Sequence, residues 1–273
     1  MLLKQDLRGG TNMNRIQSTF SALRENNKKA FVPYIMAGDG GLETLVDRLA
    51  LLEKFGATAV EVGVPFSDPV ADGPTIQRAG LRALANGTTL RGIVQEIEKA
   101  RKVVSIPIIL MTYLNPIYSY GIAEFVRDIR NAGVDGCIIP DLPIEEEEII
   151  APELERAEVE LIRLVTLTTP LERIKTISSK GKGFLYTVTV KGITGVRNEY
   201  DEELTNFIKS VTEVSSIPVM AGFGISSKEQ IQEISKYCDG VIVGSKIVDL
   251  FEQDRLSEME ELMSIIKQET NVL

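Results

Sequence analysis

The sequence predicts a single α/β domain, an eight-stranded (β/α)8 TIM barrel with an extra N-terminal helix. Short apolar runs alternate with segments of helical periodicity eight times along the 273 residues. The runs are apolar almost throughout, which is typical of strands buried on both faces of a parallel sheet. A barrel of this class uses about 250 residues as one domain. An open, doubly wound sheet would show the same alternation and remains the alternative.

The elements follow in order. Residues 1–12 carry no periodic pattern and are predicted to form a flexible extension, with Met13 as a possible alternative start, so the barrel domain covers 13–273. Ile16, Phe20 and Leu23 are spaced as one face of a short helix. The eight predicted strands cover 30–37, 57–63, 106–111, 136–139, 161–166, 184–188, 218–221 and 240–243. Predicted helices cover about 42–52, 90–97, 122–131, 145–157, 169 onward, 204–211 and 227–236, and a last helix follows Gly244-Ser245 and continues past Leu262.

Composition narrows the kinds of partner. The chain is 44 % hydrophobic and 25 % charged, which fits a globular protein, and its net charge of −9 argues against nucleic acid and anionic membranes as partners. It has neither an apolar run of about 18 residues nor a signal-peptide pattern. We therefore expect a cytoplasmic protein without a membrane partner.

Two residue counts narrow the chemistry. The chain has no histidine, which excludes a Ser-His-Asp triad and any His-ligated metal. Its two cysteines, Cys137 and Cys238, adjoin apolar runs and are predicted to be buried small hydrophobes. No lysine lies in a predicted strand, which disfavours a Schiff-base mechanism. We expect no metal and no cofactor in this chain, and acid–base catalysis by carboxylates.

Glu61 is the main candidate for that catalysis. It lies in the second strand between Val60 and Val62, so it faces the side opposite to the valines, together with Gly63. A carboxyl buried in a strand has a raised pKa and can act as both acid and base. A buried ion pair with Arg or Lys is the structural alternative.

Further polar residues follow other strand ends, where barrel active sites lie. Asp72 lies in the turn-rich loop after the second strand and is either a second catalytic carboxylate or a turn former. Tyr186, in the sixth strand, either fills the barrel or contacts a substrate. Gly224 after the seventh strand, and Gly244 and Ser245 after the eighth, precede helices whose backbone N–H groups suit a phosphate.

Several longer motifs point to one family. They are V-E-V-G-V-P-F-S-D-P-V-A-D-G-P-T-I-Q at 60–77 and, elsewhere, F-V-P-Y-I-M-A-G-D, Y-L-N-P-I-Y-S-Y-G, P-D-L-P, G-I-T-G, A-G-F-G-I-S and V-G-S. From about Met13 onward the chain resembles the tryptophan synthase alpha subunit family. The departures are mild: Gly40 replaces an expected Pro, Tyr34 a usual Phe, and Val190 an Arg of several relatives.

The resemblance implies a (β/α)8 barrel that splits indole-3-glycerol phosphate into indole and glyceraldehyde 3-phosphate by a retro-aldol reaction. It implies that Glu61 is the general acid and base and that Asp72 hydrogen-bonds the indole N–H. It also implies that Gly195, with the glycine turns, cradles the phosphate, that Tyr186 lies beside the substrate, and that Thr194 belongs to a closing loop. A beta subunit carrying PLP, in an α2β2 heterotetramer, is the implied partner.

Two other functions remain open. One is a phosphosugar isomerase or epimerase on the same barrel, which would share the phosphate turns. The other is a barrel without catalysis that activates a partner subunit. The presence of both Glu61 and Asp72 favours the lyase over the second of these.

Overall fold

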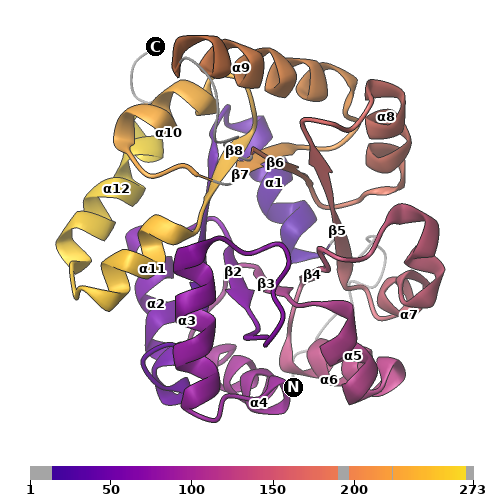
Figure 1. The fold of residues 1–273 in the computed structure, drawn as a ribbon, viewed down its shortest axis with the longest axis vertical. Coiled ribbons are helices and arrows are strands. Elements are labelled where there is room, and N and C mark those ends of the chain that lie inside the picture. The colour runs from indigo at the N-terminus through magenta and orange to yellow at the C-terminus, as the bar shows by residue number, and fades with distance from the viewer. Residues whose placement is uncertain (1–13, 190–196, 223, 269–273) are drawn as a thin grey trace, which may run out of the picture.

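Eight parallel strands close into a barrel in the order β1 to β8, with helices around it (Figure 1). The computed structural model describes residues 14–189, 197–222 and 224–268. Ala30 of β1 pairs with Gly240 of β8, which closes the ring. The predicted (β/α)8 barrel is thus confirmed and the open sheet is excluded. The predicted extension over 1–12 lies outside the described residues.

The strands are short and match the predicted runs within a few residues. Their bounds are Ala30–Met36 (β1), Val60–Gly63 (β2), Ile108–Met111 (β3), Gly136–Ile138 (β4), Glu160–Thr166 (β5), Leu185–Val188 (β6), Val219–Gly222 (β7) and Gly240–Val243 (β8). Side chains alternate between the barrel interior and the layer under the helices. In β2, Val60 and Val62 pack in the outer layer with Leu52 and Ile97. Glu61 and Gly63 therefore face the interior, as the sequence predicts.

The helices follow the predicted order, with two additions, and the last predicted helix is divided in two. Their bounds are Arg15–Glu25 (α1), Leu45–Phe55 (α2, after the 3-10 turn Leu42–Thr44), Pro74–Ala85 (α3), Leu90–Ala100 (α4), Leu114–Tyr120 (α5), Ile122–Ala132 (α6), Ala151–Arg156 (α7, after the 3-10 helix Ile144–Ile149), Leu171–Lys180 (α8), Arg197–Val214 (α9), Lys228–Ser235 (α10), Ser245–Glu252 (α11) and Leu256–Gln268 (α12). The sequence periodicity does not predict α3 and α5. The buried positions of α3 are mostly Ala and Gly, and α5 is a short helix containing Pro116, so their apolar periodicity is weak.

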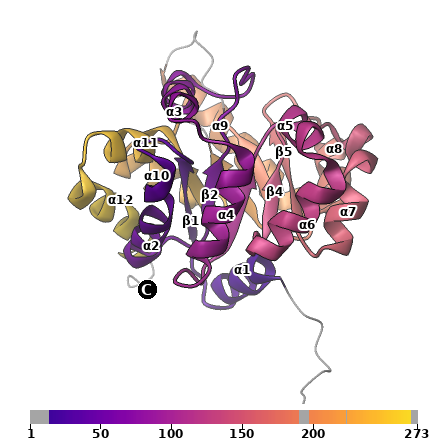
Figure 2. The ribbon, with the colours of Figure 1, turned by 90° about the horizontal axis from the view of Figure 1, so that it is seen from below.

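Helix α1 is the predicted extra helix, and it covers the N-terminal mouth of the barrel (Figure 2). The Asn14 side chain accepts a hydrogen bond from the N–H of Ile16 and so caps the helix. Ile16 and Phe20 are buried in the interior cluster, and the ring centre of Phe20 lies 5.2 Å from that of Phe184. The side of the barrel that holds the strand starts is therefore filled with side chains.

A buried carboxylate, Asp135, ties this end of the barrel together. Its side chain is 4 % exposed and accepts hydrogen bonds from the backbone N–H of Ile108 at 2.9 Å and from Arg15 at 2.8 Å. Arg101, itself mostly buried, forms the third bond to it. One carboxylate thus joins α1, the C-terminal end of α4 and the starts of β3 and β4.

Cys137 and Cys238 are free and buried, as predicted. Burial raises the pKa of their thiols to about 12 and about 11. Both therefore stay protonated at neutral pH and behave as small apolar side chains. Within the described part of the chain, no helix is long and apolar enough to cross a membrane.

Candidate active site

A small cavity, with a volume of about 80 Å³, opens at the C-terminal ends of the strands. Six of the eight predicted site residues line this cavity. They come from β2, from β6 and from the segments that follow β2, β7 and β8. Thr194 and Gly195 lie outside the described residues. The lining residues are Tyr34, Glu61, Asp72, Gly73, Ile76, Met111, Tyr186, Gly224, Gly244 and Ser245.

The carboxyl group of Glu61 is buried and lines this cavity. Its side chain comes from β2, the residue is 1 % exposed, and among the described residues neither carboxyl oxygen has a hydrogen-bond partner. Burial, reinforced by the nearby charge of Asp72, raises the pKa of Glu61 to about 8. The structural alternative, a buried ion pair, is not found among the described residues. At neutral pH Glu61 is a protonated carboxyl that faces open space.

The shifted pKa of Glu61 makes stability depend on pH. Below the ordinary value of 4.5 the carboxyl is protonated in both the folded and the unfolded chain. As the pH rises from there to about 8, only the unfolded chain loses the proton, so stability falls by about 1.4 kcal/mol per pH unit from this group. Glu61→Gln has no proton to lose, and we expect its stability relative to wild type to increase between pH 5 and 8 and then to level off. Urea unfolding of both proteins at three pH values measures this, and a constant difference would contradict it.

Asp72 reaches the cavity from the loop between β2 and α3, just before Gly73 caps α3. Burial raises the pKa of Asp72, and a hydrogen bond with Tyr113 acts in the opposite direction. The Tyr113 hydroxyl also accepts a hydrogen bond from the N–H of Ala71 at 3.0 Å. The ring of Tyr113 packs on that of Phe66, with 5.2 Å between the ring centres. Tyr113, which carries no predicted role, therefore holds Asp72 and the part of the loop that leads to it.

Two buried tyrosines form the walls of the cavity. Tyr186 belongs to the interior cluster, as the barrel-filling alternative predicts, and it also lines the cavity, so its contact with a substrate stays a prediction. A Cβ atom at Gly222 would lie 2.5 Å from the Tyr186 ring, so a glycine is needed there. Tyr34 stands likewise against Gly63. Burial raises the pKa of both phenols well above 10, so both keep their protons and can donate hydrogen bonds.

The glycine turns provide backbone donors at the other side of the cavity. Gly244 caps α11, which begins at Ser245, and the first N–H groups of a helix have no partner within it. Gly224 has a φ of +76°, and a Cβ atom there would meet no atom of the described residues within 4 Å. The space beside Gly224 is thus open, and a helix N-terminus adjoins it, which suits an anion.

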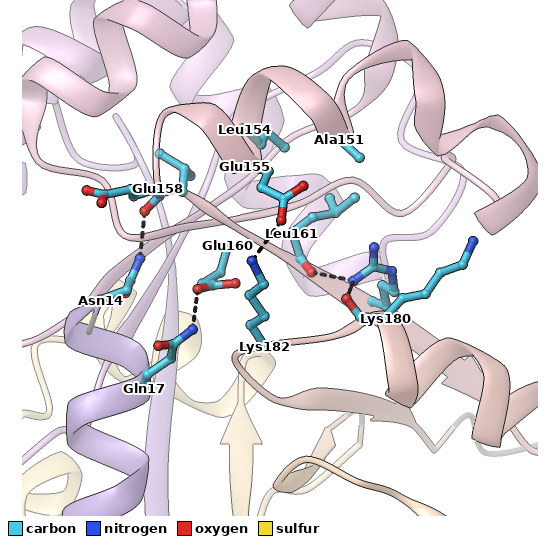
Figure 3. Close-up of a pocket in the computed structure, with 12 residues that line it drawn as sticks. Asn14, Gln17, Ala151, Leu154, Glu155, Glu158, Glu160, Leu161, Lys180 and Lys182 are labelled. Carbon is cyan, nitrogen blue, oxygen red and sulfur yellow. Dashed lines mark hydrogen bonds and ion pairs between the residues drawn. The ribbon is translucent and has the colours of Figure 1, made fainter. Parts of the chain in front are cut away.

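A second cavity, of about 410 Å³, lies at the opposite end of the barrel between α1, α7 and the start of β5 (Figure 3). Lys182 bonds Glu155 there at 2.8 Å, and Gln17 bonds Glu160 at 2.7 Å (Figure 3). The smaller cavity is the better candidate, because its carboxyl group lacks a partner among the described residues. Across the described residues, no three Cys, Asp or Glu side chains come close enough to hold a metal ion.

The fold and the cavity define a closed (β/α)8 barrel with a buried carboxyl group at its C-terminal face, where enzymes of this fold have their active sites. The family profile described as tryptophan synthase alpha chain matches residues 20–272. The chain belongs to the tryptophan synthase alpha chain family. A relative from Bacillus cereus, named tryptophan synthase alpha chain, is 53 % identical over 256 residues, covering 94 % of this chain and 98 % of its own length.

Solved structures agree with that assignment. The tryptophan synthase subunit alpha from Legionella pneumophila is similar with a TM-score of 0.86 and 36 % identity, over 96 % of this chain and 100 % of the other. A chain of Mycobacterium tuberculosis tryptophan synthase is similar with a TM-score of 0.83 and 33 % identity, over 93 % and 97 %. The likeness therefore extends over the whole barrel.

Proposed function

We propose that this chain is the catalytic alpha subunit of a tryptophan synthase, a carbon–carbon lyase of tryptophan biosynthesis. It cleaves indole-3-glycerol phosphate to indole and D-glyceraldehyde 3-phosphate in a retro-aldol reaction. Family membership supports the alpha-subunit role. The observation that carries the reaction is the carboxyl group of Glu61, which is buried, has no hydrogen-bond partner among the described residues and has a pKa of about 8.

In this proposal Glu61 moves two protons in turn. It first donates its proton to the indole carbon that bears the glycerol chain, and the ring becomes a cation. The resulting carboxylate then removes the proton from the hydroxyl on the adjacent chain carbon. The electrons of the broken C–C bond return to the ring, which leaves as indole, and the chain carbon becomes an aldehyde. Glu61 ends protonated, so it needs no metal and no cofactor in this chain.

Asp72 stabilises the cation in this proposal. Its carboxylate accepts a hydrogen bond from the indole N–H, where positive charge develops after ring protonation. That role needs the ionised form. The hydrogen bond from Tyr113 favours this form and works against the effect of burial. Tyr186, buried beside both carboxylates, packs against the substrate.

The phosphate binds at Gly224, Gly244 and Ser245 in this proposal, with Gly195 from the loop after β6. These groups are backbone donors, so an acidic chain with net charge −9 can hold an anion there. Thr194 belongs to the same loop, which closes over the substrate and excludes water. Gly195 and Thr194 enter through the family resemblance, since they lie outside the described residues.

Gly224→Asp tests the phosphate position. We expect KM for indole-3-glycerol phosphate to rise by about 10- to 100-fold, because a carboxylate would occupy the open space and repel the phosphate. Gly87→Asp is the matched control: Gly87 has a φ of +73° and equally open surroundings, but it is exposed at the far end of α3. Equal effects of the two substitutions, measured by steady-state kinetics, would show backbone strain instead of phosphate repulsion.

The partner in this proposal is a tryptophan synthase beta subunit that carries PLP and receives the indole, in an α2β2 heterotetramer. We propose a cytoplasmic location and neither nucleic acid nor membrane as partner, in keeping with the acidic charge.

One assay tests the proposed reaction against the alternatives. The purified chain is mixed with indole-3-glycerol phosphate, and glyceraldehyde 3-phosphate is followed with and without a beta subunit. Release of the aldehyde by this chain supports the lyase. If the chain only raises the activity of the beta subunit, it is a non-catalytic activator. Absence of cleavage, together with conversion of a phosphosugar in a separate assay, would indicate an isomerase.

A further inference from the structure

Tyr34 lies where the phosphate turn and the catalytic carboxyl meet. It sits in β1, beside Glu61 in the register of β1 and β2, and is 6 % exposed. A Cβ atom at Gly244 would lie 3.6 Å from the Cβ of Tyr34, and one at Gly63 would lie 1.9 Å from its hydroxyl oxygen. The side chain therefore extends from the start of α11 to the strand that carries Glu61, along one wall of the cavity.

The hydroxyl of Tyr34 lacks a strong partner in the ligand-free protein. Among the described residues, its recorded hydrogen bond goes to the Met36 sulfur at 3.9 Å, and a thioether is a weak acceptor. A phenylalanine would fill the same space without burying a hydroxyl, which costs free energy when the hydroxyl is poorly bonded. The ligand-free fold therefore gains little from this oxygen.

The surroundings keep this hydroxyl protonated. Burial, followed by the nearby carboxyl groups of Asp72 and Glu61, raises the pKa of Tyr34 well above 10. The group is thus a neutral donor at any pH at which the protein works. Both oxygens of Glu61 also lack partners among the described residues, so two polar side chains line the same cavity with unused hydrogen-bonding capacity.

We propose that the Tyr34 hydroxyl donates a hydrogen bond to a hydroxyl oxygen on the three-carbon chain of the substrate. This inference rests on the proposed function. With the phosphate at Gly244 and the reacting ring carbon at Glu61, the chain carbons must lie between them, along the span that Tyr34 covers. Tyr34 is then a specificity residue, which favours a hydroxylated chain over a plain alkyl chain.

The test compares two proteins with two ligands. The proteins are wild type and Tyr34→Phe; the ligands are indole-3-glycerol phosphate and indole-3-propanol phosphate, whose chain lacks both hydroxyls. We expect Tyr34→Phe to lower kcat/KM for the substrate by about three- to tenfold, mainly through KM, because the bond forms on binding. The inhibition constant of the propanol phosphate should stay within about twofold, since it offers no chain oxygen.

Two further measurements separate this role from a packing defect. The ligand-free variant should melt at the wild-type temperature or above it, because a poorly bonded hydroxyl has been removed. Tyr237→Phe is the control: its hydroxyl bonds Glu233 at 3.0 Å just before the start of β8, at the opposite end of the barrel, and its loss should change neither ligand constant.

Each remaining outcome overturns the assignment. Equally weaker binding of both ligands would mean that the substitution shifted the aromatic ring at position 34. Unchanged kinetics would mean that the Tyr34 hydroxyl forms no hydrogen bond with the substrate. If wild type cleaves the substrate and Tyr34→Phe matches it, only the role of Tyr34 fails. If wild type does not cleave it, the proposed function fails and the role of Tyr34 with it.

Discussion

Glu61→Gln should lower kcat for cleavage of indole-3-glycerol phosphate by about 10²- to 10⁴-fold and change substrate binding little. Glutamine keeps the shape of the side chain but can neither donate a proton to the ring nor accept one from the chain hydroxyl. Both steps are assigned to this one carboxyl. The wild-type activity should also fall as the pH rises above about 8, because Glu61 then begins the cycle without its proton.

Steady-state release of glyceraldehyde 3-phosphate measures the loss, and binding of indole-3-propanol phosphate shows that the site remains intact. Glu160→Gln is the matched control, because Glu160 is also a strand carboxyl with a raised pKa, although it is only half-buried. It lies at the start of β5, at the end of the barrel away from the cavity. Wild-type turnover in Glu61→Gln would remove Glu61 from the mechanism.

Asp135→Ala should lower the free energy of unfolding by about 3–5 kcal/mol. The substitution removes the acceptor of three hydrogen bonds and leaves Arg101, which is 11 % exposed, without its paired charge. It also leaves the N–H of Ile108 buried and unbonded at the start of β3. A buried unpaired charge is more harmful than the loss of an exposed ion pair.

Chemical denaturation of the two proteins measures this difference. Glu124→Ala provides the contrast, since Glu124 pairs with Arg91 at 3.3 Å while both side chains are more than half exposed. We expect that change to stay below about 1 kcal/mol. A similar loss in both variants would mean that the Asp135 cluster contributes no more than a surface ion pair.

The barrel was predictable because seven of the eight strands are buried along their whole length, and all eight give apolar runs that stand out from the polar loops. Helix α3 was not, because Ala79, Gly80 and Ala83 face the barrel and small residues give weak periodicity. The signal that could have revealed it is the Gly73-Pro74 pair, since Pro is common at the first position of a helix. The same pair is equally typical of a turn, so it does not decide between the two.

The site residues could be predicted where the residue type is unusual for its position in the sequence. A carboxylate between strand valines is visible in the sequence, and so are glycine turns after the last two strands. Tyr34 was noticed only as a departure from the family, because a tyrosine in an apolar run is also typical of a barrel core. Its meaning depends on the poorly bonded hydroxyl and on the contact with Gly63, which pairing between distant segments creates.

Helix α1 determines from which end of the barrel small molecules can reach the cavity. Because Ile16 and Phe20 fill the N-terminal mouth of the barrel, small molecules reach the described cavity from the C-terminal side. Substrate entry and product exit therefore use the same opening. A partner that captures the product therefore needs to cover only that opening. A barrel open at both ends would have to be covered at both.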